Sequence, residues 1–182
     1  MSGTPTHPGG EPVVLDDGAP DGVAVVRVTT REQLEQAWEV RMEVFVDEQQ
    51  VPTEEEIDDL DTAATTSHVL AVDTATGAVI GTARLLSEAD HPGEVHLGRL
   101  AVRAAARSRG VGARLVVAIE GLALAEHAVR GAAPGTLAVT VVLSAQEAAM
   151  GFYARLGYAV VNGERYLDAG IWHQDMAHTV AS

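Results

Sequence analysis

Arg107, Gly110 and Gly112 stand where a predicted strand gives way to a predicted helix. Apolar residues after Gly110 recur at the spacing of an amphipathic helix, so we expect that helix to start at the glycines. The first turn of a helix has backbone N–H groups without a partner and the positive end of the helix dipole, and glycine lets a ligand approach the main chain closely. These residues therefore predict an anion site that suits a phosphate group.

Arginines gather around these glycines although the chain is strongly acidic. Its 182 residues include 12 basic and 26 acidic side chains, which give a formal net charge of -14. A local concentration of arginines against that sign points to a phosphorylated ligand. The overall acidity argues against binding to nucleic acid or to an anionic membrane, because either needs a broad basic surface. The clustered arginines are Arg99, Arg103, Arg107, Arg109 and Arg114.

Two other phosphate-binding motifs fit the chain less well. The dinucleotide motif G-x-G-x-x-G needs a third glycine where this chain has Leu115. A Walker A loop needs a lysine, and the chain has none. The chain also lacks cysteine, which excludes disulfides, thiolate nucleophiles and cysteine-ligated metals, and we expect no metal site.

The hydrophobic pattern predicts one mixed α/β domain that begins near residue 23. Residues 1–22 are rich in proline and glycine and lack apolar periodicity, which is typical of disorder. A strand, a helix and a second strand follow one another from residue 94 to residue 144, which indicates a parallel pair with a crossover. We expect strands at 23–28, 67–73, 78–86, 94–102 and 136–144, helices at 31–46, 112–128 and 146–156, and a final strand after Gly157.

The spacing Arg107-x-x-Gly110-x-Gly112 after a strand resembles the acyl-CoA signature of the GNAT superfamily of N-acyltransferases. An aromatic and glycine pattern at 152–158 resembles a second motif of that superfamily. Two further segments resemble its ElaA-type branch: R-x-x-V-F-V-x-E-Q-x-x-P at 41–52 and a closing segment at 163–176. All four segments occur in the correct order. The chain departs from the pattern at Trp172, where a proline is expected, and in lacking the asparagine that usually opens the 146–156 helix.

This resemblance implies the GNAT fold over residues 23–182. The fold has a central, mostly antiparallel sheet with a splayed parallel pair of strands and flanking helices. The resemblance also implies acetyl-CoA as cosubstrate, with its pyrophosphate on the glycine turn and its pantetheine arm along the strand before it. The residues that would hold acetyl-CoA are Leu100, Ala101, Val102, Arg107, Arg109, Gly110, Val111, Gly112, Ala113, Gln146 and Tyr153.

The expected reaction is transfer of an acetyl group to a primary amine by direct attack in a ternary complex. Family resemblance places Tyr153 beside the sulfur of the donor, where it would act as the acid. The base that removes the proton from the amine stays open among Glu48, His96, His173 and an ordered water chain. The acceptor pocket is expected to contain Glu48, Gln49, Arg99 and His173, although a buried hydrogen-bonding role fits Gln49 and Arg99 equally well.

Nine acidic residues lie between Glu43 and Asp61 without a basic residue among them. A block of like charges is often only solvated, but beside an active site it would attract a cationic amine. The acceptor is therefore expected to be a small-molecule amine or a lysine side chain.

Two other functions stay open: a non-catalytic acyl-CoA-binding or sensor module, and an acyl-homoserine-lactone-type synthase, which shares a similar V-F-V-x-E-Q run. No segment resembles a signal peptide or a membrane span, so we expect a cytoplasmic protein. A homodimer is also open, because apolar closing strands often pair in this family.

Overall fold

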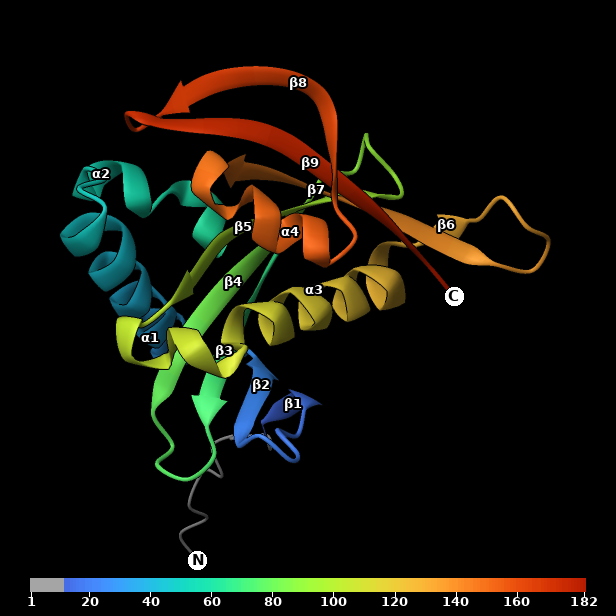
Figure 1. The fold of residues 1–182 in the computed structure, drawn as a ribbon. Helices are drawn as coiled ribbons and strands as arrows, with labels where there is room; N and C mark the ends of the chain where they lie inside the picture. Colours follow the sequence, from blue (N-terminus) through green and yellow to red (C-terminus); the bar gives the residue numbers. More distant parts are fainter. Residues whose placement is uncertain (1–11) are drawn as a thin grey trace, which may run out of the picture.

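The computed structural model describes residues 12–182 and contains one nine-stranded sheet (Figure 1). Its strand order is β1-β2-β3-β4-β5-β7-β9-β8, with β6 beside β7, and β5 and β7 form the parallel pair. The predicted mixed α/β GNAT fold class is confirmed. The strands are β1 (Val13–Asp16), β2 (Val23–Arg27), β3 (Thr66–Asp73), β4 (Val79–Ser87), β5 (Glu94–Val102), β6 (Val129–Arg130), β7 (Leu137–Gln146), β8 (Ala159–Asp168) and β9 (Ile171–Ala181).

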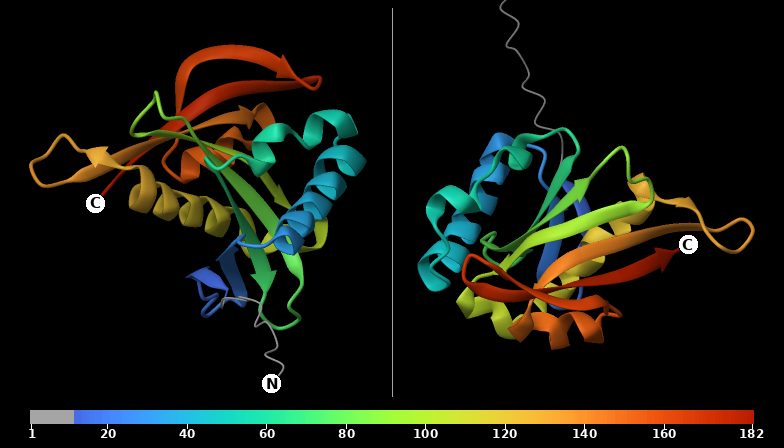
Figure 2. Two further views of the ribbon diagram at one scale, coloured as in Figure 1. Left: turned by 180° about the vertical axis from the view of Figure 1, so that it is seen from behind. Right: turned by 90° about the horizontal axis from the view of Figure 1, so that it is seen from above.

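Helices cover both faces of the sheet (Figure 2). On one face α1 packs against β3, β4 and β5, and on the other α3 packs along β2 to β5 and β7. Leu115 and Ile119 of α3 are completely buried, and each fully buried aliphatic side chain stabilises the fold by about 1.5–3 kcal/mol. None of the helices in residues 12–182 has the length and apolarity to cross a membrane. The helices are α1 (Arg31–Arg41), α2 (Thr53–Glu56), α3 (Val111–His127) and α4 (Met150–Arg155).

The predicted first helix is longer than expected and changes its winding. Thr30 caps α1 in a capping box with Gln33, as the sequence pattern of a helix start predicts. After Arg41 the chain continues as a π-helical turn over Met42–Glu48. Such turns are rare and often occur at functional sites.

Three boundaries differ from those expected. Residues 13–16 form β1, an edge strand paired with β2, so the predicted disorder is wrong for the described part of that segment, whereas residues 1–11 lie outside the described residues. The pairing of β7 with β9 continues to Gln146, so the next helix begins later, with a 3-10 turn at Glu147–Ala149 and then α4. The final strand is a hairpin of β8 and β9.

The strands β5 and β7 pair over only a short distance and then separate. Their pairing joins Glu94–His96 of β5 to Thr140–Val142 of β7, and no described strand pairs with that edge of β5 beyond His96. On its other edge β5 carries a bulge: Thr82 pairs with Ala101 and Arg84 with Gly98, which leaves Arg99 and Leu100 between them. Bulges of this kind are common next to active sites.

Candidate active site

A cavity of about 680 Å³ lies between the separated ends of β5 and β7. The π-helical turn, α2, the first turn of α3, α4 and the β8–β9 turn also contribute to its walls. Most of the predicted site residues meet there. Those that line the cavity are Glu48, Gln49, Arg99, Leu100, Ala101, Val102, Arg107, Gly110, Gly112, Ala113, Gln146, Tyr153 and His173.

The glycine turn opens α3 at one end of this cavity. Gly110 has a φ of 70°, a left-handed conformation that strains other residues, and α3 begins directly after it. Gly112 faces α4, because a Cβ atom built there would lie 3.1 Å from Cζ of Phe152. Gly112 therefore allows the close packing of two elements as well as an approach to the backbone.

Two of the predicted cofactor-binding residues, Arg109 and Val111, do not line the cavity. The Arg109 guanidinium donates to Oδ2 of Asp73, the last residue of β3, at 2.6 Å, and Val111 is buried in the core. Either residue could therefore contact an anion at the glycine turn only through its backbone.

The arginines around the glycine turn are all paired with carboxylates. This corrects the prediction that they form a cluster of positive charge free to bind a phosphorylated ligand. Only two of the five, Arg99 and Arg107, line the cavity. The partners are Glu56 and Asp58 for Arg99, Glu43 for Arg103, Glu48 for Arg107, Asp73 for Arg109, and Asp16 and Asp21 for Arg114. The attraction for an anion at this turn therefore depends on backbone N–H groups and the helix dipole more than the sequence suggests.

Two contacts join opposite walls of the cavity. Gln146 at the end of β7 donates its amide to Oε1 of Gln49 at 2.8 Å. Arg107 donates to Oε2 of Glu48 at 2.5 Å and to the carbonyl of Val102 at 3.0 Å. Glu48, one of the candidate bases, is thus held in an ion pair.

Tyr153 of α4 is buried and lines the cavity. Its burial raises the pKa of the phenol to about 12. The hydroxyl therefore keeps its proton at neutral pH and is available as a hydrogen-bond donor.

A hydrogen bond of His173 defines which of its two ring nitrogens carries the proton. The side chain is 7 % exposed, and Nδ1 lies 2.7 Å from the carbonyl oxygen of Ile171. A carbonyl can only accept, so Nδ1 carries the proton, and Nε2 of the neutral ring has a free lone pair. The ring of Tyr166 lies nearly parallel to the imidazole, with an interplanar angle of 18° and 5.9 Å between centroids. His96, by contrast, is exposed beside Glu94 and does not line the cavity.

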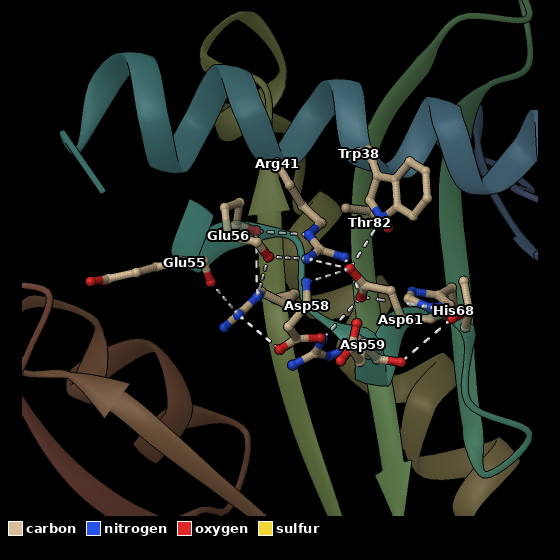
Figure 3. Close-up of polar contacts among 12 residues, drawn as sticks. Trp38, Arg41, Glu55, Glu56, Asp58, Asp59, Asp61, His68 and Thr82 are labelled. Carbon is tan, nitrogen blue, oxygen red and sulfur yellow. Dashed lines mark hydrogen bonds and ion pairs between the residues drawn. The ribbon is translucent and has the colours of Figure 1, made fainter. Parts of the chain in front are cut away.

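A buried network of charged residues lies behind the bulge of β5 (Figure 3). Arg41 on α1 reaches Glu56 at 2.7 Å and Asp61 at 2.8 Å, and Arg84 on β4 also reaches Asp61, at 2.9 Å. Burial by itself would raise the pKa of Asp61, but the two arginines outweigh it and lower that pKa to about 2. The network fixes the loop around α2 to the sheet.

Arg99 belongs to this network, which favours the second of its two predicted roles. Its guanidinium donates to the carbonyl oxygens of Glu55 and Glu56 and approaches Asp58 at 3.4 Å. Its φ of 51° is a left-handed conformation that few non-glycine residues adopt. Arg99 therefore ties the bulge to the α2 loop, and its hydrogen-bonding groups are largely occupied by the protein.

Comparison with known proteins gives the family of the chain. A model of the GNAT acetyltransferase domain matches residues 25–180. The chain belongs to the GNAT family. A relative from Bacillus subtilis, named "Uncharacterized N-acetyltransferase YjcF", is 38% identical over 145 residues, which are 80% of this chain and 91% of that protein.

Two solved structures are similar to this chain over most of their length. The ElaA protein of Escherichia coli has a TM-score of 0.70 and 26% identity, with 85% of this chain and 98% of that chain covered. An acyl-CoA N-acyltransferase from Pseudomonas aeruginosa has a TM-score of 0.69 and 30% identity over the same shares. The predicted ElaA-type resemblance is confirmed, and the chain is a GNAT acyltransferase.

The β8–β9 turn and Glu55 of α2 also line the cavity of this GNAT enzyme. Neither was predicted from the sequence as part of the site, although Glu55 belongs to the acidic block. Asp168, Ala169 and Ile171 are far from the glycine turn in the sequence, and the β8–β9 hairpin brings them to the wall of the same cavity. The motif at 163–176 identified this segment as part of the family pattern, but it did not predict that the turn between β8 and β9 lines the cavity.

Proposed function

We propose that this GNAT enzyme transfers an acetyl group from acetyl-CoA to a primary amine by direct attack. The observation that carries the proposal is one cavity that joins a glycine turn, an unpaired strand edge, a buried tyrosine and an imidazole with a free lone pair. The chain has no cysteine for a thioester intermediate, which favours the direct route.

The donor would use the glycine turn and β5. Backbone N–H groups from Gly110 to Ala113 suit the pyrophosphate. The edge of β5 that β7 leaves free offers main-chain groups around Leu100 to Val102 for the pantetheine amides and for the acyl carbonyl. An N–H group aimed at that carbonyl would stabilise the negative charge that develops during attack.

The protein groups at the reacting atoms then have distinct roles. Nε2 of His173 accepts the proton of the amine, which must attack as the neutral base. The nitrogen–carbon bond forms as the tetrahedral intermediate develops, and the carbon–sulfur bond breaks as it collapses. The hydroxyl of Tyr153 donates to the leaving thiolate and stabilises its charge.

Gly112→Asp is expected to weaken acetyl-CoA binding at least about tenfold, because a carboxylate would repel the pyrophosphate and its Cβ atom would press on Phe152. Isothermal calorimetry measures the affinity. Gly121→Asp on the same helix is the control, because a Cβ atom there meets nothing within 4 Å. Gly112→Ala adds the Cβ atom without the charge. An equal loss of acetyl-CoA affinity in both Gly112 variants would assign the effect to packing against Phe152 alone. Unchanged affinity in both variants would show that the pyrophosphate does not bind at the glycine turn.

Thermal unfolding tests the donor directly. Acetyl-CoA at about 100 times its dissociation constant adds roughly 2.7 kcal/mol of stability. For a domain of this size that is a rise in Tm of roughly 5–10 °C. ATP and NADH serve as controls and should give a smaller rise.

A rise with acetyl-CoA but no turnover on a panel of amines would favour the sensor module. Turnover that requires S-adenosylmethionine would favour the lactone synthase. The cytoplasmic location and the homodimer stay predictions.

A further inference from the structure

The acidic block around α2 divides into paired and unpaired carboxylates. Five of its nine members form ion pairs with arginines that lie outside the block: Glu43, Glu48, Glu56, Asp58 and Asp61. Among the described ion pairs, none involves the other four, which are Asp47, Glu54, Glu55 and Asp59. Of these four, only Glu55 lines the cavity. Figure 3 shows its side chain pointing away from the buried network.

Asp168 supplies a second unpaired carboxylate to the same cavity. It ends β8, where it pairs with Ile171 across the turn, and no described arginine forms an ion pair with it. Figures 1 and 2 both place α2 beside the β8–β9 turn, away from the start of α3. The cavity therefore has the glycine turn at one end and two carboxylates without ion pairs at the other.

We propose that Glu55 and Asp168 form a subsite for a protonated amine, and that the acceptor is an aliphatic diamine or polyamine. One nitrogen of the acceptor reaches His173 as the neutral nucleophile, and a second nitrogen stays charged at the two carboxylates. This inference rests on the proposed function, because it assigns the acceptor of that same site.

Two further features of the cavity favour such an acceptor. Val51 and Ile171 line the same space and suit the methylene chain between two nitrogens. His173 is more than nine-tenths buried and lines the cavity, and no hydrogen bond of the described residues involves its Nε2, so this nitrogen can accept a proton from the attacking amine. Glu55 and Asp168 are both exposed, so solvent and salt screen their attraction, and each contributes moderately.

The test compares putrescine with butylamine as acceptors, because the two differ in the second amine. The wild-type enzyme is expected to have a KM about tenfold lower for putrescine, and salt should reduce that advantage. Glu55→Gln and Asp168→Asn should each raise the KM for putrescine about threefold and leave that for butylamine unchanged. Glu54→Gln is the matched control, since Glu54 lies on α2 but does not line the cavity.

The possible failures are distinguishable. Equal KM values for both amines in all four proteins, with turnover intact, would overturn the subsite and leave the transferase standing. Better turnover of a lysine-containing peptide than of any diamine would also overturn it. Loss of acetyl-CoA binding or of all turnover in the wild type would instead remove the proposed function itself.

Discussion

Asp61→Asn lowers the free energy of unfolding by about 3–5 kcal/mol, because it leaves two buried guanidinium groups without their shared carboxylate. Arg41 and Arg84 both pair with Asp61, whose side chain is completely buried, and the indole of Trp38 also donates to it. Urea unfolding of wild type and variant measures the difference. Asp59→Asn is the control, because Asp59 lies exposed in the same 3-10 turn and should change stability by less than about 0.5 kcal/mol.

The pH dependence of unfolding gives a second readout of the same substitution. The pKa of Asp61 is about 2 in the folded protein and 3.8 in its unperturbed state, so its contribution is complete above about pH 4 and is lost as the pH falls to 2. That contribution amounts to about 2 kcal/mol. Burial raises the pKa of Glu56, which acts in the opposite sense and flattens the total curve. If Asp61→Asn loses as much unfolding free energy between pH 4 and pH 2 as the wild type does, the ionised Asp61 does not stabilise the fold.

His173→Gln is expected to lower kcat by about 100-fold or more, as removal of a general base does, while the affinity for acetyl-CoA stays unchanged. Glutamine keeps a side-chain N–H group that can donate to Ile171, but its amide is not basic. His96→Gln is the matched control, because His96 is the other histidine considered as the base and lies outside the cavity. Steady-state kinetics and calorimetry measure the two quantities.

The candidate bases predict different patterns in that experiment. If His173 is the base, Glu48→Gln alters donor binding through its partner Arg107 more than it alters kcat. If kcat falls in Glu48→Gln and not in His173→Gln, Glu48 is the base and the imidazole only shapes the pocket. Unchanged kcat in all three variants would favour proton loss through water.

The sequence predicted the elements whose signals are local. Strand β5 has the predicted bounds, and α3 begins at the glycine turn. Both predictions depend on apolar periodicity and glycine positions within short segments of the chain. Most of the predicted site residues meet in one cavity for the same reason, since they lie on these elements or on recognised motifs. Those features depend little on distant parts of the chain.

The features that sequence reasoning missed depend on contacts between distant residues. The acidic block contains no basic residue, and its partners Arg84 and Arg99 come from strands that follow it in the sequence. The strand β1 has little periodicity of its own and is formed by pairing with β2. Glu55 and Asp168 have no ion pair because the described arginines pair with other carboxylates. No local sequence pattern predicts which carboxylates those are.

The short pairing of β5 with β7 leaves the sheet incomplete between these two strands. Beyond His96 no strand within residues 12–182 lies opposite the amide hydrogens on one edge of β5, so hydrogen exchange there measures access by solvent. If the donor's own amides line that edge, the cosubstrate takes the place of a missing strand. Slower exchange at Leu100 to Val102 with CoA bound would then report that a small molecule completes the sheet's hydrogen bonding.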